Sequence, residues 1–332
     1  MKSYVYALLG LLSLLGTSCS DKSQEDSVIS ERYVHKYGYA LSKAEWEAKN
    51  HPGQVITTLS NGVTITSTYE NGMLHGPMTL TYPHSQTVET YYLYNQGNKV
   101  KEISYDPIGM PVKEWIQLSP TRYSISMWYN EGCPMLVEEF AGPELLDGQY
   151  FSMSNEVESR IEKGAGLRIL RDRSGALVSK EIVEQGYTVK KETHYPNGAP
   201  ETIAYYHLNN LHGEKRSYAQ NGEPLAIEEW VGGKLHGMAT YFKNGNRYLE
   251  VSYLYGQKNG IERHYIDGDM LSQEICWEND KKHGASTFYV DGKAEKQWFY
   301  AGESVSKRRF DEYSELDHMF LVNKPYATEE QR

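Results

Sequence analysis

The sequence predicts an all-β fold: an elongated antiparallel β-meander of repeated hairpins with short terminal helices. The first observation behind this prediction is a dipeptide, Asn-Gly or Asp-Gly, that recurs with spacings of 24, 23, 23 and 24 residues. The second is a glycine that recurs between these dipeptides with nearly the same period. A fixed period of this length is typical of a repeat array. The five dipeptides are Asn197-Gly198, Asn221-Gly222, Asn244-Gly245, Asp267-Gly268 and Asp291-Gly292.

Each dipeptide predicts a tight hairpin turn between two strands. A type I′ turn needs positive φ at both central residues, and Asn or Asp followed by Gly adopts it at the least cost. After Asn244-Gly245, Leu249 and Val251 alternate with Glu250 and Ser252, and this period of two is typical of a half-buried strand. Each repeat is therefore expected to be two antiparallel strands closed by this turn.

The recurring glycines are expected in the connector at the other end of each hairpin. Four of them lie in the C-terminal repeats, and Gly76 is a distant earlier copy that follows the turn Asn71-Gly72. Aromatic residues follow both marks at strand-like distances. Stacked hairpins would bury these aromatics, because a single hairpin is only marginally stable in water. The five repeat glycines are Gly76, Gly213, Gly237, Gly260 and Gly284.

This pattern resembles the MORN-repeat family in its bacterial variant form. The family has an Asn-Gly turn, an aromatic strand with Glu, spaced glycines and a second aromatic strand. One copy here is Asn221-Gly222, Glu229-Trp230, Gly233, Gly237 and Phe242. The match is clean over residues 195–310 and partial over residues 59–105. The resemblance implies an elongated, twisted sheet with a shallow groove, and it implies no activity by itself.

The chain is predicted to divide into six segments. The longest departs from the repeat over about residues 106–193, where Asp147-Gly148 and Ser174-Gly175 are expected to be eroded turns. The segments are a signal peptide at 1–18, a disordered tether at 19–40, a short helix with a lead-in at 41–58, a diverged β-repeat region at 59–193, the regular repeats at 194–310, and a capping helix with a tail at 311–332.

Short helices are expected at both ends of the array. Ser42 and Glu45 have the spacing of a capping box, which predicts a helix start. Tyr313, Leu316 and Phe320 lie at helical spacing near the other end. Terminal elements that cover the last open strand are expected in repeat arrays.

The N-terminal segment has the features of a bacterial lipoprotein signal. Lys2 precedes the apolar run Val5–Leu15, whose 11 residues suit a secretory signal and fall short of a membrane span. Thr17-Ser18-Cys19 resembles a lipobox, although Gly16 stands where Leu is usual. We expect lipidation at Cys19 rather than the alternative, an ordinary signal peptide that contains a cysteine. Lipid and polar tether would hold the protein at the bacterial membrane. By resemblance to the sorting of some diderm bacteria, the outer membrane is favoured, with the periplasmic or surface face left open.

The charge balance argues against partners that require basic surfaces. The 34 cationic and 44 anionic side chains give a net charge of −10, and removal of Lys2 with the signal makes it −11. Nucleic acid and anionic lipid headgroups bind to basic patches, so neither is expected as the main partner. The short basic runs Lys190-Lys191 and Lys307–Arg309 are expected to be solvated surface.

Four histidines, His75, His212, His236 and His283, hold the same repeat position and raise the question of a metal ladder. Equivalent positions in neighbouring hairpins are about 9.5 Å apart, too far for two imidazoles to share one zinc ion. We therefore expect these histidines to pack against loops or lie at the surface, and we expect no metal and no other cofactor.

Cysteine chemistry and enzyme motifs give little further signal. Cys133 and Cys276 are far apart in the repeat array, so separate thiols are favoured over a disulfide. The sequence contains no nucleophile elbow, phosphate loop, metalloprotease helix or dinucleotide fingerprint. Carboxylate pairs such as Glu138-Glu139 and Glu228-Glu229 adjoin along strands, so their side chains are expected on opposite faces. No catalytic residue is predicted.

The favoured function is a non-enzymatic, lipid-anchored envelope scaffold that presents an aromatic-rich repeat sheet to a protein or glycan partner. The runner-up is a soluble regulatory or antitoxin-like binding protein of the same repeat family. A third possibility is a hydrolase site in the irregular middle region, for which the sequence offers no triad or metal set.

Overall fold

The computed structural model describes residues 27–290 and 293–322, with side chains up to Met319. The predicted signal peptide, Cys19 and the turn Asp291-Gly292 lie outside the described residues. Within them the fold is the predicted all-β antiparallel meander, with 26 strands and two short helices, and it does not close into a barrel. The chain forms two compact units, one up to Lys99 and one from Val100.

In the first unit, β1 (Val28–His35) lies between β2 (Ala40–Leu41) and β3 (Gly53–Leu59). From β3 onward, consecutive strands pair in a meander. Its core cluster is Leu59, Ile65, Met78 and Tyr94. The remaining elements are α2 (Lys43–Lys49), β4 (Thr64–Glu70), β5 (Met73–Thr81) and β6 (Val88–Asn95).

Strand β1 corrects the prediction of a disordered tether, made for residues 19–40, at residues 28–35. The segment is polar at its start, but Val28, Ile29, Tyr33 and Val34 have high strand propensity. Their pairing partner β3 is distant in the chain, beyond a helix, so no local turn signal announces the pairing. The predicted lead-in after the helix is likewise a strand, because it coincides with β3.

Helix α2 begins at the predicted capping box. The Glu45 backbone N–H donates to Ser42 Oγ at 3.2 Å, and the Ser42 N–H donates to the Glu45 carboxylate at 2.9 Å. These bonds satisfy two backbone donors that a helix start leaves free. The Trp46 ring lies 5.7 Å from the Tyr33 ring and 5.9 Å from the Tyr69 ring, centroid to centroid, and so joins the helix to the sheet.

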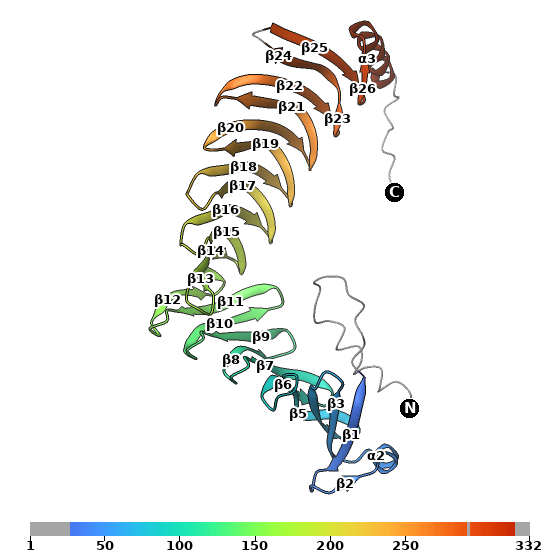
Figure 1. Ribbon diagram of the computed structural model, residues 1–332, viewed down its shortest axis with the longest axis vertical. Coiled ribbons are helices and arrows are strands. Elements are labelled where there is room, and N and C mark those ends of the chain that lie inside the picture. The colour runs from blue at the N-terminus through green and yellow to red at the C-terminus, as the bar shows by residue number, and fades with distance from the viewer. Residues whose placement is uncertain (1–26, 291–292, 323–332) are drawn as a thin grey trace, which may run out of the picture. The chain divides into compact units, whose positions relative to one another are not determined.

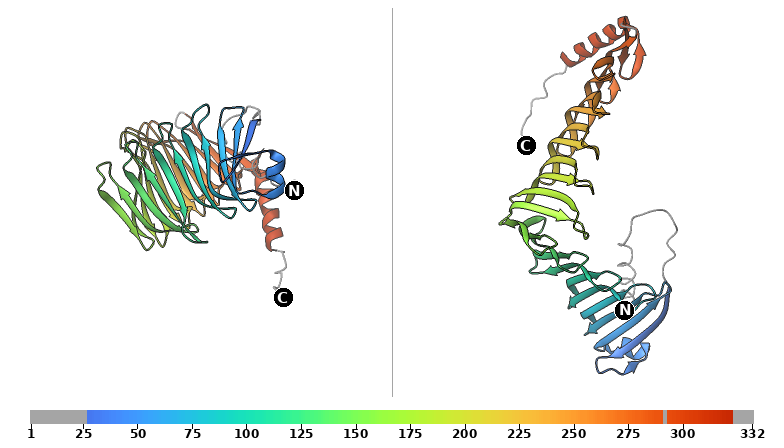
Figure 2. Two further views of the ribbon diagram at one scale, coloured as in Figure 1. Left: turned by 90° about the horizontal axis from the view of Figure 1, so that it is seen from below. Right: turned by 60° about the vertical axis from the view of Figure 1, so that its left-hand side comes forward.

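The second unit is a longer meander that ends in α3 (Lys307–Val322). Its strands are β7 (Asn98–Tyr105, which begins at the unit boundary), β8 (Pro111–Gln117), β9 (Arg122–Trp128), β10 (Pro134–Ala141), β11 (Glu144–Phe151), β12 (Val157–Glu162), β13 (Ala165–Arg171), β14 (Leu177–Glu184), β15 (Tyr187–His194), β16 (Pro200–His207), β17 (Asn210–Tyr218), β18 (Pro224–Val231), β19 (Lys234–Lys243), β20 (Asn246–Leu254), β21 (Gln257–Ile266), β22 (Met270–Glu278), β23 (Lys281–Lys282), β24 (Gly284–Val290), β25 (Lys293–Tyr300) and β26 (Glu303–Val305). Figure 1 shows β14 to β25 in chain order, and Figure 2 shows them as one layer. The largest core cluster of this unit is Tyr129, Met135, Leu136, Leu145, Tyr150, Ile161 and Val183.

Helix α3 begins earlier than the predicted residue 311. Ser306 precedes it, and the Ser306 hydroxyl accepts a hydrogen bond from the Arg309 N–H at 3.3 Å, which is the role of an N-cap. The Phe310 ring lies 5.0 Å from the Trp298 ring, and the Tyr300 hydroxyl donates to Asp317. The helix therefore contacts β25, as expected of a terminal element.

We call the edge of the repeat sheet that carries the Asn-Gly and Asp-Gly dipeptides the first edge, and the opposite edge the second edge. Two kinds of turn close the first edge. At Asn244-Gly245 and Asp267-Gly268 both residues have positive φ, 52° and 76° in one turn and 48° and 96° in the other. At Asn197-Gly198 and Asn221-Gly222 only the glycine has positive φ, which corrects the type I′ prediction there. The loop is one residue longer at these positions: the Gly222 N–H donates to the Ala219 carbonyl, as in a type I turn followed by a glycine bulge.

The second edge, at which the sequence predicted Gly-containing connectors between hairpins, is also closed by tight turns. Gly232-Gly233 and Tyr255-Gly256 have positive φ at both residues. Asn71-Gly72 in the first unit, with φ of 52° and 74°, is equivalent to these turns rather than to the Asn-Gly turns of the first edge. The reason is that Gly76 follows it at the distance at which Gly237 follows Gly232-Gly233.

The repeat glycines lie in strands, at bulges, and not in the connectors. Gly237 belongs to β19, where three residues face the single residue Glu229 of β18. Gly237 has a φ of 99°, and a Cβ on it would lie 3.3 Å from the Glu229 Cβ. Both the positive φ and the close approach favour glycine. The same contact recurs as Gly76 over Thr68, Gly213 over Tyr205, Gly260 over Ser252 and Gly284 over Cys276.

The middle of the second unit continues the meander. Asp147-Gly148, expected as an eroded turn, lies within β11, where a Cβ on Gly148 would come 2.6 Å from the Tyr150 hydroxyl. The strand therefore uses Gly148 to make room for a buried tyrosine. Ser174-Gly175 is a turn, as expected, with a φ of 95° at the glycine.

Candidate binding surface

The strand register sorts the side chains of β16 to β24 into two faces. Side chains alternate along a strand and cross-strand partners share a face, so rows of partners can be followed across the sheet. We call one side the closed face; its central row is Ala204, Lys215, Glu228, Ala239, Val251, Glu262 and Ile275. We call the other side the open face; its central row is Ile203, Arg216, Ile227, Thr240, Glu250, Arg263, Glu274 and Thr287.

The closed face is covered by its own side chains. Every buried residue of β16 to β24 except Thr287 lies on this side. Ala239 and Val251, at 0% and 1% exposed, are as inaccessible as residues under a second layer. Aromatic side chains two positions further along the strands share this face and are large enough to cover the smaller side chains of its central row, Ala204, Ala239 and Val251. These aromatic residues are Tyr206, Trp230, Tyr253 and Trp277.

Lysines lie over two of these rings. The Lys215 ammonium lies 5.7 Å from the Trp230 ring centroid, and the Lys258 ammonium lies 4.7 Å from the Trp277 ring centroid. Each contact is a cation–π interaction, worth about 0.5–1 kcal/mol at exposed sites. The Trp230 and Trp277 rings are therefore engaged within the protein.

Carboxylates of the closed face are also paired. Glu228 accepts from the Tyr241 hydroxyl at 3.4 Å and lies 3.5 Å from Lys215. Glu262 lies 2.6 Å from His264 Nε2 and also accepts from Lys258. Burial alone would raise the pKa of Glu262, but the bonds from Lys258 and His264 outweigh it and hold this pKa below the ordinary value.

The open face keeps large side chains partly exposed. A second row on this side contains Tyr205, Met238 and Ile261, which are 42%, 37% and 36% exposed. Glu229 and Ser252 share this row, because Met238 is the cross-strand partner of Ser252 and the repeat glycines place Glu229 in line with them. Glu214 of β17, the cross-strand partner of Glu229, belongs to the same row, so the exposed row combines apolar and polar side chains.

Charges on the open face are balanced by local pairs. Arg263 Nε lies 2.9 Å from Glu274, and the Tyr265 hydroxyl donates to Glu250 at 2.7 Å. Arg216 Nε lies 2.6 Å from Glu214. The open face thus combines paired charges of both signs with Tyr, Met and Arg side chains, and these three residue types are enriched at protein–protein interfaces.

A buried charge network lies in the irregular middle region. Arg168 donates to both Glu138 oxygens, at 2.6 and 2.9 Å, and to Glu181 at 3.0 Å. The Tyr150 hydroxyl donates to Glu138 at 2.7 Å, and Lys191 lies 2.9 Å from Glu181. Two anions face two cations, so the charges cancel and the carboxylates are occupied by bonds within the protein. This arrangement holds five strands together and gives no support for a hydrolase site in this region.

Burial and pairing act against each other on the pKa values of this network. Burial alone would raise the pKa of Glu181, but Arg168 and Lys191 hold it below its ordinary value. Burial alone would lower the pKa of Arg168, but its bonds to Glu138 and the charge of Glu181 raise it. Both groups therefore stay charged at neutral pH.

The repeat histidines join neighbouring hairpins. The Nδ1 atom of His75 accepts from the Gln96 N–H at 3.3 Å, and that of His236 accepts from the Tyr255 N–H at 3.4 Å. Each donor is the first positive-φ residue of the next tight turn. His283 Nδ1 is placed 3.4 Å from the Ala301 N–H in the same way. The expected loop-packing role is therefore confirmed for these three histidines, whereas the His212 ring lies 5.8 Å from the His207 ring, centroid to centroid.

The cysteines and basic runs have separate outcomes. Cys133 and Cys276 are free thiols, and burial raises the pKa of Cys276. The expectation that Lys190-Lys191 is solvated surface is wrong for Lys191, which pairs with the buried Glu181. Sequence composition cannot reveal such a partner, because Glu181 lies on the preceding strand, opposite Lys191.

Sequence reasoning did not single out the exposed row of the open face. A usable signal was present: Met238 and Ile261 each directly follow a repeat glycine, Gly237 and Gly260. The residue after the bulge returns to the open face, so the repeat period marks these positions as well as the turns.

In the part of the chain that the structure describes, no three His, Cys, Asp or Glu side chains gather closely enough to hold a metal ion. Neither α2 nor α3 is long and apolar enough to cross a membrane. No family model matches this chain, and no curated protein matches it.

Proposed function

We propose that this protein is a non-enzymatic binding protein that presents the open face of its repeat sheet to a protein partner. The observation that carries the proposal is the asymmetry of the two faces. Tyr205, Met238 and Ile261 stay partly exposed on the open face, whereas the buried residues of β16 to β24, with the exception of Thr287, lie on the closed face. Partly exposed Tyr, Met and Arg side chains are the residue types that contribute most at protein interfaces.

A protein partner is favoured over a glycan. Met238 and Ile261, at 37% and 36% exposed, offer apolar contact to a protein but no hydrogen bond to a sugar hydroxyl. The exposed apolar side chains come from β16, β19 and β21, three and two strands apart. These steps correspond to about 14 Å and about 10 Å at the usual strand spacing, so a partner element would lie across the strands.

We further propose that the protein is a lipid-anchored member of the bacterial MORN-variant repeats, located at the outer membrane. The apolar run Val5–Leu15 and the lipobox-like Thr17-Ser18-Cys19 support the anchor. The hairpin period and the glycine bulge support the repeat assignment.

Selection from a phage-displayed peptide library, with a glycan array as the second arm, tests the binding function. The probe protein is the full chain, compared with a Met238→Ser/Ile261→Ser variant. The matched control is Tyr255→Ala, which changes an exposed turn residue outside the open-face rows. We expect peptides that bind the wild type and the control and lose affinity for the open-face variant by about tenfold or more, as for an interface anchor. Peptides that bind all three proteins equally, or ligands from the glycan arm alone, would contradict the proposal.

A further inference from the structure

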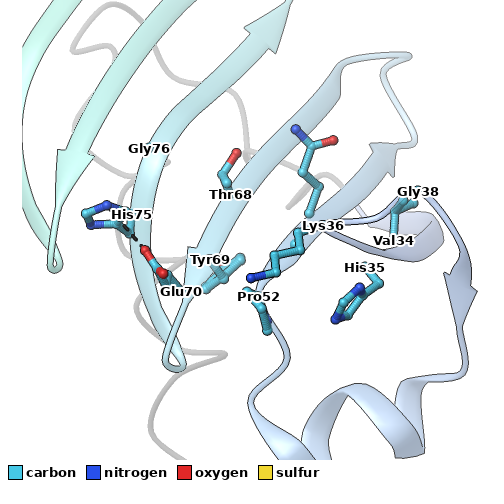
Figure 3. Close-up of a pocket in the computed structure, with 12 residues that line it drawn as sticks. Val34, His35, Lys36, Gly38, Pro52, Thr68, Tyr69, Glu70, His75 and Gly76 are labelled. Atoms are coloured by element: carbon cyan, nitrogen blue, oxygen red, sulfur yellow. Dashed lines mark ion pairs between the residues drawn. The ribbon is translucent and has the colours of Figure 1, made fainter.

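A cleft in the first unit is distinct from the open face and has the dimensions of a ligand site. It encloses about 510 Å³, and small-molecule sites typically enclose about 300–1,000 Å³. Strands β1, β3, β4 and β5 and the loop 36–38 supply its walls (Figure 3). Gly38, Gly53 and Gly76 contribute backbone but no side chain to its lining.

The floor of the cleft holds polar groups without partners. Gln54 and Thr68 are cross-strand partners on β3 and β4, so their side chains lie next to each other on one face. The Thr68 hydroxyl is buried and has no hydrogen-bond partner in the structure. Buried polar groups nearly always have a hydrogen-bond partner, so an unpaired hydroxyl marks a position at which a ligand can supply one.

The rim of the cleft carries one cation and one anion. Glu70 lies 3.4 Å from His75 Nε2 on one side, and Lys36 lies on the other (Figure 3). The Lys36 ammonium rests 5.2 Å from the Tyr37 ring centroid and pairs with no carboxylate of the described residues. Burial, together with His51 and Lys36, lowers the pKa of His35, so this histidine is neutral at pH 7. The fixed charges around the cleft therefore cancel.

We propose that this cleft binds a neutral saccharide of one or two rings. A sugar hydroxyl both donates and accepts, and the Gln54 amide and the Thr68 hydroxyl do the same. Lys36 adds donors and Glu70 adds acceptors at the rim. A carboxylated or phosphorylated ligand gains from Lys36 but is repelled by Glu70, so net charge brings no advantage. The proposal goes beyond the open-face function, because it concerns another unit and another class of ligand.

Saturation-transfer-difference NMR on the full chain tests this proposal. The probes are glucose, galactose, N-acetylglucosamine, maltose and chitobiose, with glucuronate as the charged arm. We expect at least one neutral sugar to bind the wild type, and Gln54→Leu and Thr68→Val to weaken it by about tenfold, as for a lost hydrogen bond. The control is Thr66→Val, which lies on the same strand and face but outside the cleft lining, and it should bind like the wild type.

The melting temperature (Tm) of each free variant distinguishes a loss of sugar binding from a loss of folding. Thr68→Val removes a buried hydroxyl without a partner, so it should raise the Tm of the free protein while weakening sugar binding. A raised Tm with unchanged binding would overturn the proposal, because Thr68 would then be a packing feature only. The absence of binding by any neutral sugar, or tighter binding of glucuronate than of glucose, would overturn it too. The double variant Met238→Ser/Ile261→Ser should leave sugar binding unchanged. The cleft proposal can therefore fail or hold independently of the proposed binding function of the open face.

Discussion

Gly260 lies directly over Ser252: a Cβ on this glycine would stand 3.0 Å from the Ser252 Cβ. Gly260 also has a φ of 103°, a conformation that L side chains rarely adopt. Gly198 shares the positive φ, at 81°, but a Cβ on it would meet no atom of a neighbouring residue within 4 Å. The two glycines therefore separate backbone strain from close packing of adjacent hairpins.

Gly260→Ala should destabilise the protein more than Gly198→Ala. Positive φ alone costs about 1–2 kcal/mol for alanine, and that cost applies to both. The crowded contact with Ser252 adds about 1–3 kcal/mol, the usual cost of overpacking. Urea unfolding measures both differences, and Ser252→Gly combined with Gly260→Ala should recover the crowding part only. Equal losses at the two glycines would show that the bulge contact does not constrain the sheet.

Stability should fall in acid because two buried carboxylates have depressed pKa values. Glu181 and Glu262 both titrate below the reference value of 4.5 in the folded protein. A group with a lowered folded pKa contributes stability above its unfolded pKa, and this contribution is lost as the pH falls through the folded pKa. The free energy of unfolding should therefore decline below pH 4.5.

Glu262→Gln provides the check on this prediction. It should lower the free energy of unfolding at pH 7 and make the decline below pH 4.5 shallower. The control is Glu223→Gln at an exposed turn, which should leave the pH profile as in the wild type. Parallel profiles for the Glu262 variant and the wild type would rule out Glu262 as a source of the acid dependence.

Removal of one whole hairpin should leave a folded protein. Deletion of Asn221–Lys243 removes β18 and β19 and lets Asn244-Gly245 take the place of Asn221-Gly222. Contacts in such an array run between neighbours, so the register of the remaining strands is kept and some stability is lost. Deletion of β18 alone should do far more harm, because it inverts the direction of every later strand. Circular dichroism and thermal melting of the two deletions decide, and equal collapse of both would contradict the hairpin repeat.

The sequence predicted the features that depend on local chemistry. The predicted type I′ turns at Asn244-Gly245 and Asp267-Gly268 and the alternation of Leu249 and Val251 against Glu250 hold in the structure, because turn geometry and strand period act over a few residues. Alternation fails where a bulge adds a residue. Arg247 lies two positions before Leu249, yet it contacts Glu250 on the open face because the pairing shifts between them.

Features that depend on distant pairing were not predictable. The polar start of the β1 segment suggests a tether, and nothing near β1 marks its pairing with β3, which follows a helix. The network of Glu138, Arg168 and Glu181 joins three strands, and no spacing in the sequence connects them. The cleft of the first unit likewise gathers groups from four strands, each of which is ordinary by itself.

Cys19→Ala should release the protein from membranes. The apolar run followed by Thr17-Ser18-Cys19 predicts lipidation of this cysteine, and the acyl chains would supply the anchor. Expression in a bacterium, membrane fractionation and intact mass measure the outcome. We expect an acylated wild type in the membrane fraction and a soluble or unprocessed variant. Identical fractionation of both proteins, without acyl mass on the wild type, would remove the lipoprotein assignment.

Hydroxyl-radical footprinting with mass spectrometry tests most directly whether the open face is the binding surface. The full chain is oxidised alone and with the best peptide from the display selection. Without peptide, Met238 and Tyr205 should react readily, in line with their exposure. With peptide, both should be protected, while Tyr255 in its exposed turn reacts as before. Protection confined to the turns or to the closed face, with Met238 and Tyr205 unchanged, would contradict the proposed function.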